Sequence, residues 1–514
     1  MKQPSDFLWQ LIKSLDRNEK LFIRRNFLSR SAQEGKVYVQ LFDAISTQKT
    51  YNEDFILKRL GPALNRTNIS SQKHYLQQLI CESLIRYEGR DSVSQEIFNQ
   101  ILLVRIFRKK GLLEDAHNTW RKAVSLAQET ESLALLNLLK TEFEKMILFS
   151  SVHTRYDELH TLLKKNVVNH KEYTNIIALG DIYAETILLK RKTHFEIGPQ
   201  LKTKIESLLK QVEKHSAALK SPSFWFRHYY LINKATLLYL LNRIPASSQV
   251  LRQLLAIWHE KPHFMKTEGE HYVELMYMIN YAVVKEGDYS YVMQVFNDKK
   301  NDLITEPLQR ANFEAIKYLA FNKIYNKTAR YDEVDKLVRF MKVKYVQWEP
   351  LLNSDMNQTV NLSLGIASFA LERYDDALYF TKRGVTYFKD GTREEHSSLA
   401  QILLLLISYC IDNDRLFDSQ YRATYTYFYK RKKKQPFESA LVSCLHRSFY
   451  MKDNKRKVKE YQKALQVFEE NKENEVQQAM VSIFNYPAWL QSRAERIPYQ
   501  KFIERKVKDG LISG

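Results

Sequence analysis

Glycine and proline are scarce in this sequence, which has 13 glycines and 11 prolines in 514 residues. A collagen-like repeat and long flexible linkers are therefore excluded, and a fold of many short strands would lack the turn residues that it needs. Leucine, lysine and glutamate, which favour helices, are frequent instead. The composition predicts a nearly all-helical protein.

Cysteine and long apolar runs are also rare. The three cysteines, Cys81, Cys410 and Cys444, lie far apart and form no C-x-x-C pair, which excludes a thiolate metal cluster and fits a reducing compartment. The longest apolar run, residues 399–411, is too short to cross a bilayer. The first residues lack the apolar segment of a secretory signal. We therefore expect a cytoplasmic protein with no membrane segment.

The sequence patterns of common active sites are missing as well. The chain contains no G-x-G-x-x-G, no phosphate-binding loop, no G-x-S-x-G and no H-E-x-x-H. His259 and His263 lie four residues apart, but Pro262 between them disfavours a helical pair of metal ligands. We expect a protein that is not an enzyme and that uses no metal and no cofactor.

Basic residues outnumber acidic ones, 79 to 59, which gives a net charge of +20. Such an excess favours an anionic partner, for example nucleic acid. The cations are spread along the whole chain, so the alternative is a solvated helical surface with no such partner. Both interpretations stay open on charge alone.

A nearly identical pentapeptide occurs three times, as RYDEL at 155–159, RYDEV at 330–334 and RYDDA at 373–377. We take the last residue of each copy as a marker, and weaker copies add further markers. The markers are Ala116, Leu159, Ser247, Val292, Val334, Ala377 and Ser419. They follow one another at about 43 residues, apart from one gap of two intervals after Leu159, and such even spacing indicates a repeat array.

Each pentapeptide separates two stretches with the apolar period of a helix. Residues 361–372 form such a stretch before RYDDA, and Ala377 begins the apolar face of the next one. Asp375 and Asp376 fall in the first turn of that second helix, where carboxylates complement the helix dipole. Tyr374 is expected to fill the bend. The repeat unit is therefore predicted to be a helix hairpin, and stacked hairpins bury one another.

The residues of this unit resemble the tetratricopeptide repeat. Leu364 and Gly365, then Ala377 thirteen residues after Leu364, and then the small Gly384 are similar to its signature. The period departs from the family, because it is about 43 residues here against about 34 in that repeat. Longer helices or loops would account for the difference.

A second unit carries the same resemblance. Tyr318 and Tyr325, ahead of Val334, match the two aromatic positions of the signature, although Asn322 replaces its small residue. The resemblance covers about residues 100–460 and implies a protein-binding scaffold with no catalytic residue. The opening block LIKSLDRNEKLF is also similar to those of uncharacterised bacterial helical-repeat proteins.

We expect an all-α protein, an α-solenoid of eight or nine stacked antiparallel helix hairpins behind a helical N-terminal cap. The predicted segments are the N-terminal helical cap at 1–95, the solenoid at 96–480 and a C-terminal cap or tail at 481–514. In the cap, Asp16 and Glu19 are expected to form a capping box that starts a helix. A DNA-reading helix-turn-helix is the alternative for the cap, but its ten-residue turn is too long.

The resemblance also implies a binding groove, because the first helices of tetratricopeptide-like hairpins line a concave face. The positions that this spacing selects are Tyr229, Tyr239, Tyr277, Tyr281, Lys323 and Asn326. Tyrosines commonly dominate interfaces. The alternative is that these tyrosines pack between hairpins and contact no partner.

A basic run near the end of a predicted helix is a second candidate site. Aromatic residues from Tyr421 onward precede Lys430, Arg431, Lys432, Lys433 and Lys434. Aromatic rings beside cations suit an anion-binding edge that contacts nucleic acid. The alternative is structural, because cations also stabilise the C-terminal end of a helix.

These observations predict a non-enzymatic scaffold that binds a protein or peptide through its solenoid. The alternative function is nucleic-acid binding or regulation through the basic surface. Self-association through the ends of the solenoid also stays open.

Overall fold

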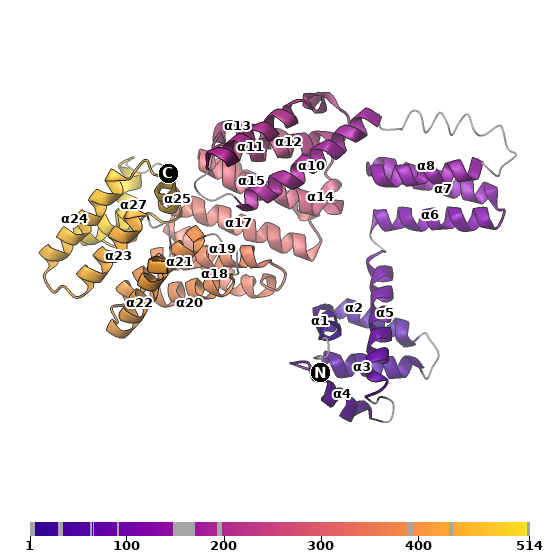
Figure 1. The fold of residues 1–514 in the computed structure, drawn as a ribbon, viewed down its shortest axis with the longest axis horizontal. Coiled ribbons are helices and arrows are strands. Elements are labelled where there is room, and N and C mark those ends of the chain that lie inside the picture. Colours follow the sequence, from indigo (N-terminus) through magenta and orange to yellow (C-terminus); the bar gives the residue numbers. More distant parts are fainter. Residues whose placement is uncertain are drawn as a thin grey trace. The chain divides into compact units, whose positions relative to one another are not determined.

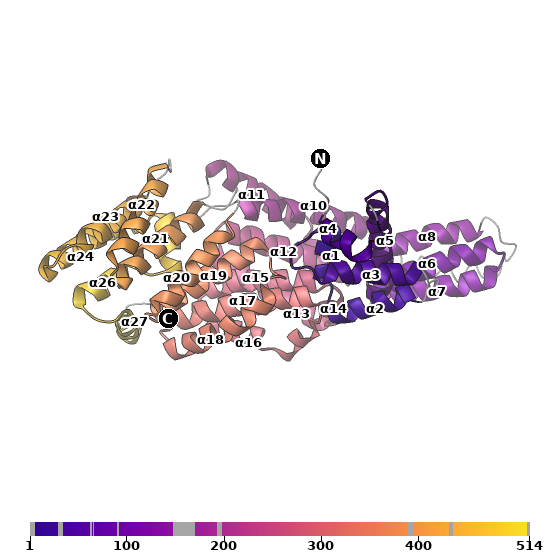
Figure 2. The same cartoon turned by 90° about the horizontal axis from the view of Figure 1, so that it is seen from below.

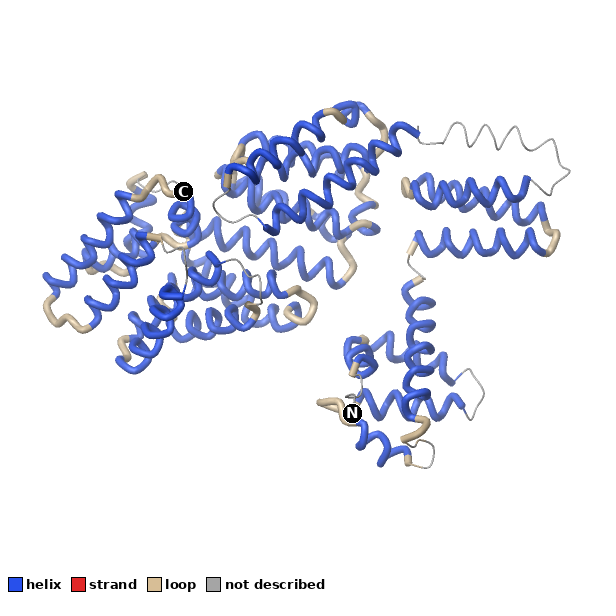
Figure 3. Tube along the Cα trace, viewed as in Figure 1, coloured by secondary structure: helices blue, strands red, loops and turns tan. Residues whose placement is uncertain are grey.

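The computed structural model describes residues 6–28, 34–61, 64, 66–89, 92–147, 170–192, 198–388, 394–430 and 435–510. These residues form helices and no strands (Figure 3), and successive helices pack as in an α-solenoid, so the predicted fold class is confirmed. None of the described helices combines the length and the apolar character that a membrane-spanning helix needs. The chain divides into two compact units, residues 1–168 and 169–514. The predicted boundaries at 95 and 480 stay a prediction.

Helices α1 to α5 of the first unit (Figure 1) contribute to one hydrophobic core, in which Ile12, Phe42 and Ile80 are fully buried. The predicted capping box is confirmed, because the Glu19 backbone N–H donates to Asp16 over 2.7 Å and the Asp16 N–H donates to Glu19 over 2.6 Å. The helices are α1 (Phe7–Ser14), α2 (Arg17–Leu28), α3 (Glu34–Ser46), α4 (Glu53–Leu60) and α5 (Ile69–Glu88).

The other helices described in this unit are α6 (Val93–Lys109), α7 (Leu113–Glu129) and α8 (Leu133–Ile147). They share a separate core around Trp120, which is fully buried and stacks on Phe143. The Trp120 indole N–H donates to the Leu139 carbonyl over 2.8 Å, so its one polar atom is satisfied inside the core.

The second unit consists of successive helix pairs. The first helix of each pair contacts the first helix of the following pair. Figures 1 and 2 both show α15, α17 and α19 side by side. The helices up to the middle of the unit are α10 (His170–Lys192), α11 (Pro199–Glu213), α12 (Phe224–Leu240), α13 (Ile244–Glu260), α14 (Phe264–Thr267), α15 (Gly269–Glu286) and α16 (Tyr289–Phe296). The later pairs are α17 (Pro307–Lys327) with α18 (Tyr331–Trp348), α19 (Ser354–Ala370) with α20 (Tyr374–Thr386), α21 (Glu394–Ile411) with α22 (Asp414–Lys430), and α23 (Pro436–Phe449) with α24 (Asn454–Glu470).

The pentapeptides RYDEV and RYDDA mark a recurring bend between two helices, while RYDEL lies outside the described residues. Before RYDDA, Glu372 adopts a φ of 57°, and the Arg373 N–H donates back to the Ser368 carbonyl over 2.9 Å. Before RYDEV, Ala329 adopts a φ of 53°, and the Arg330 N–H donates to the Tyr325 carbonyl over 2.8 Å. A left-handed residue with this hydrogen bond is the Schellman end of a helix.

The same bend occurs at the weaker copies. Four further residues adopt a positive φ two positions before the start of a helix, as Glu372 and Ala329 do. They are Gly111, Asn242, Gly287 and Asp412. The marker then lies five residues after the bend, and Ala116, Ser247, Val292, Val334 and Ala377 are fully buried there. In the last copy this position is the buried Phe417, so the marker predicted at Ser419 is two residues too late.

Helices α19 and α20 approach each other closely at Gly365. A Cβ atom at this position would lie 2.3 Å from Thr381 Oγ1 and 3.3 Å from the Thr381 backbone nitrogen. Thr381 is fully buried, and its hydroxyl donates to the Ala377 carbonyl over 2.7 Å, so it has little room to move. The Leu-Gly pair of the repeat signature therefore permits this contact between two backbones.

The C-terminal helices α25 (Glu475–Ile483), α26 (Tyr486–Glu495) and α27 (Tyr499–Lys508) pack on earlier hairpins. Phe369 of α19 contacts Phe484 and Trp489, with ring centroids 5.4 and 6.5 Å away. Arg493 donates a hydrogen bond of 3.2 Å to the hydroxyl of Tyr374, the tyrosine of RYDDA. Tyr374 therefore helps to hold the C-terminal helices on this bend, and its predicted role of filling the bend stays a prediction.

We predict that Gly365→Ala destabilises the protein by about 1–3 kcal/mol, since the added methyl group overpacks the contact between α19 and α20. Gly180→Ala in α10 is the matched control, because nothing lies within 4 Å of a Cβ there. Alanine should stabilise that helix by about 1 kcal/mol. Thermal unfolding followed by circular dichroism tests both variants. Equal melting temperatures for the two would contradict the close approach.

Candidate functional site

One narrow stripe of α15 remains accessible along the middle of the helix, where most of the other residues are buried. Tyr277, Tyr281 and Lys285 follow one another at intervals of four, and each keeps part of its surface exposed. Neighbouring positions such as Met276 and Ile279 are fully buried against other helices. Residues four apart share a helix face, so the stripe presents two aromatic rings and a cation in one row.

The tyrosines of this stripe contact residues of two neighbouring helices. Tyr277 and Tyr281 pack with ring centroids 4.6 Å apart, and the Tyr277 hydroxyl donates to that of Tyr281 over 3.2 Å. Tyr239 of α12 meets Tyr281 at 6.3 Å between ring centroids. Lys190 of α10 lies 4.4 Å from the centre of the Tyr277 ring and pairs with Glu274 over 2.7 Å. Three of the predicted groove tyrosines therefore lie together.

Three lysines extend the row on α15 and α17. Lys285 donates to the Asn242 side chain over 2.8 Å. Burial, together with the nearby charges of Lys327 and Lys285, lowers the pKa of Lys323 to about 8. Burial also lowers the pKa of Lys327. We call the set Lys190, Tyr239, Tyr277, Tyr281, Lys285, Lys323 and Lys327 the tyrosine–lysine band.

Carboxylates do not balance the lysine end of this band. Burial lowers the pKa of Lys285, and the negative charge of Glu475, which raises this pKa, is too weak to restore it. Within the described part of the chain, the ammonium group of Lys323 forms no ion pair and no hydrogen bond to another side chain. Part of the Lys323 side chain is still accessible. An enclosed but reachable cation without a counter-charge favours an anionic ligand.

The other two predicted groove residues lie in different surroundings. Tyr229 belongs to an aromatic cluster, with ring centroids 5.6 Å from Tyr183, 5.9 Å from Trp225 and 6.0 Å from His271. Asn326 donates two hydrogen bonds to Asn322, over 2.8 and 2.9 Å, which fix its amide along α17. The groove assignment as a whole stays a prediction.

Sequence reasoning missed Lys285 and Lys327, although each lies four residues after a predicted groove residue, Tyr281 and Lys323. Helical spacing alone was sufficient to find them. Lys190 had no such signal, because only the packing of α10 against α15 brings it over Tyr277. Of the predicted anion-binding edge, Lys430 ends α22 and is exposed, whereas Arg431, Lys432, Lys433 and Lys434 lie outside the described residues.

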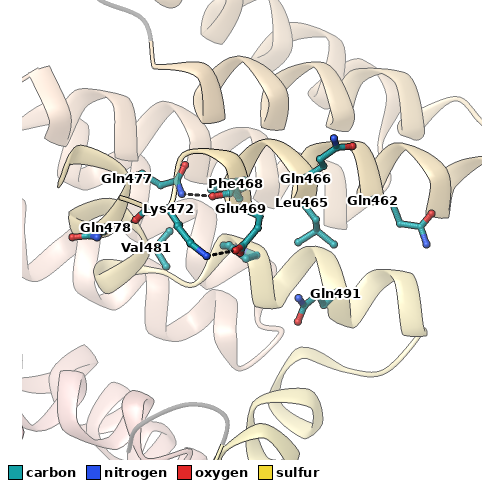
Figure 4. A pocket seen from close by; sticks show the side chains of 11 residues that line it. Gln462, Leu465, Gln466, Phe468, Glu469, Lys472, Gln477, Gln478, Val481 and Gln491 are labelled. Carbon is teal, nitrogen blue, oxygen red and sulfur yellow. Dashed lines mark hydrogen bonds and ion pairs between the residues drawn. The ribbon is translucent and has the colours of Figure 1, made fainter. Parts of the chain in front are cut away.

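A hollow of about 530 Å³ lies between α24, α25 and α26 and shares no residue with the tyrosine–lysine band (Figure 4). Lys472 pairs there with Glu469 over 2.6 Å, and Gln477 donates to the Phe468 carbonyl over 2.6 Å. The remaining lining residues are Gln462, Leu465, Gln466, Gln478, Val481, Pro487 and Gln491. The two charged residues of the lining, Lys472 and Glu469, neutralise each other, so the band is the better candidate site.

The described residues contain no group of three or more His, Cys, Asp or Glu side chains that could hold a metal ion. No protein-family model, no curated protein and no solved structure matches this sequence. The resemblance to the tetratricopeptide repeat therefore stays a prediction.

We predict that Lys323→Met stabilises the protein at pH 7 by about 1–3 kcal/mol, because each unit of pKa depression costs about 1.36 kcal/mol. Between the folded pKa of about 8 and the ordinary lysine pKa of 10.5, the unfolded chain binds more protons than the folded chain, so wild-type stability rises with pH in that window. The gain of the variant should therefore shrink toward pH 10. Melting temperatures at pH 7 and 10, with Lys317→Met on the same helix as the control, test this. A gain independent of pH would contradict it.

The buried His228 predicts a second pH dependence. Its side chain is fully buried, and among the described residues neither ring nitrogen has a hydrogen-bond partner. Burial, and then the nearby His271, hold the pKa of His228 well below 6.5. Below about pH 6.5 the unfolded chain gains a proton that the folded chain does not, so stability falls as the pH decreases.

We expect His228→Phe to lose less thermal stability than the wild type between pH 6.5 and 5. Phenylalanine preserves the stacking on Phe224, whose ring centroid lies 5.9 Å from that of His228. Melting curves at both pH values measure the loss. An equal loss in both proteins would mean that other groups cause the acid sensitivity.

Proposed function

We propose that this chain is a non-enzymatic scaffold that binds an extended, acidic segment of a partner polypeptide along the tyrosine–lysine band. The observation that carries the proposal is the charge of Lys323, which is enclosed next to Lys285 and Lys327 without a carboxylate of its own. A carboxylate from a partner would remove the repulsion among the three lysines. The resemblance to the tetratricopeptide repeat implies the same kind of role.

The tyrosines suit the rest of such a segment. Tyr239, Tyr277 and Tyr281 offer rings with hydroxyl groups, which contact both the apolar side chains and the polar backbone of a peptide. The three residues come from two helices already fixed by their buried faces, so little side-chain entropy remains to be lost on binding. The free cysteines fit a partner in the cytoplasm.

We predict that Tyr277→Ala/Tyr281→Ala weakens partner binding by at least about tenfold, because central tyrosines of an interface commonly contribute 2 kcal/mol or more. Affinity capture with the tagged full-length protein from its native cells compares the variant with the wild type. Poly-L-glutamate is added as a competitor. Partners that bind through the band should be lost from the variant and displaced by the competitor.

Tyr379→Ala is the matched control, since Tyr379 is 55% exposed on α20 and lies outside the band. The control should capture the same partners as the wild type. Recovery that is unchanged in the double variant would contradict binding through the band. Partners lost from the double variant but not displaced by poly-L-glutamate would contradict their acidic character.

A further inference from the structure

Five aromatic rings form a continuous strip on the surface of α22 and α23. In order along the strip the residues are Tyr450, His446, Tyr421, Tyr425 and Tyr429. The His446 and Tyr421 rings stack at 4.0 Å and 15°, and Tyr425 and Tyr429 lie 6.4 Å apart at 17°. Tyr421 and Tyr425 are 6.1 Å apart, as are His446 and Tyr450.

The strip faces solvent, whereas the opposite side of α22 holds the helix in the fold. Tyr429 is 80% exposed and Tyr425 and Tyr450 are each 52% exposed. Phe417, Thr424 and Phe428 of the same helix are buried. The buried residues of α22 are therefore explained by packing against the rest of the protein. The exposed tyrosines on the other side of the helix are not explained by such packing.

Both cations and acids lie close to this strip along α22 and α23. Arg422 and Lys430 are exposed on α22, three residues before Tyr425 and directly after Tyr429 in the chain, and Arg447 is exposed on α23, directly after His446. Arg447 lies 3.5 Å from Glu460. At the other end, Asp418 accepts a hydrogen bond from the Tyr450 hydroxyl, and Asp414 is exposed.

We propose that this strip binds single-stranded nucleic acid, with bases stacking on the exposed tyrosines and phosphates pairing with Arg422 and Lys430. Stacking suits any base, because every base has an aromatic face, and adjacent cations follow the backbone. Two of the four ring pairs, His446 with Tyr421 and Tyr425 with Tyr429, are near-parallel, and such flat faces match bases better than they match an acidic peptide, which offers charge but no planar face. The net charge of +20 adds a general attraction for a polyanion.

The test measures the anisotropy of labelled oligo-deoxythymidylate and oligouridylate, each longer than one site of about 4–16 nucleotides, with the full-length protein. We expect the wild type to bind, with affinity that falls steeply as salt increases. Comparison of the two oligonucleotides distinguishes DNA from RNA as the natural ligand. No binding by the wild type at low salt would overturn the proposal.

Tyr425→Ala/Tyr429→Ala should weaken binding at least about tenfold, since stacking contributes about 1–3 kcal/mol per base and 1.4 kcal/mol is a factor of ten. Tyr425→Phe/Tyr429→Phe retains both rings and should bind as the wild type does. Tyr379→Ala, an equally exposed tyrosine on α20, is the second control. All these side chains are exposed, so the melting temperatures should stay unchanged.

Lys430→Gln should reduce the dependence of affinity on salt, because one phosphate contact is lost. Undiminished binding by the double alanine variant would overturn the stacking role. Displacement of the oligonucleotide by poly-L-glutamate at equal charge concentration would also overturn it, because charge alone would then account for the binding. These outcomes do not depend on the tyrosine–lysine band, which shares no residue with the strip.

Discussion

The bend after the first helix of a hairpin is the constraint on which the second unit depends. A residue with positive φ, such as Glu372 or Ala329, reverses the chain and closes the helix with a backbone hydrogen bond. The second helix of the hairpin then starts two residues after this residue. The residue five positions after the bend is buried in the core, as Val334 and Ala377 are. A non-glycine residue in this conformation costs about 1 kcal/mol or more, and the burial of Val334 or Ala377 offsets that cost.

The candidate site is a consequence of this packing. Because neighbouring hairpins cover most of α15 and α17, only narrow stripes of these helices keep contact with solvent. Lysines on the stripes are then forced close together, and Lys323 loses hydration without gaining a counter-charge. A ligand that supplies negative charge would relieve the repulsion among these lysines, so its binding would stabilise the folded protein.

The C-terminal helices use the same repeat for a second purpose. Tyr374 and Tyr331 occupy equivalent positions in RYDDA and RYDEV, and both face the C-terminal helices. Arg493 donates to Tyr374, and Tyr499 and Glu504, together with burial, raise the pKa of Tyr331. The residues shared by the two pentapeptides therefore have two roles. They follow a bend between two helices, and their tyrosines interact with α26 and α27.

The sequence alone determined the helical class, through its composition, and the even spacing of the bends, through the repeated pentapeptide. The choice of Tyr277 and Tyr281 as groove residues was implied by the resemblance to the tetratricopeptide repeat. The sequence could not place Lys190 over Tyr277 or Arg493 beside Tyr374, because those pairs are 87 and 119 residues apart and only the stacking of hairpins joins them. The sequence also did not separate the buried Phe428 from the exposed Tyr429. Tertiary packing decided that difference, because α22 rests on its neighbours with one side and leaves the other in water.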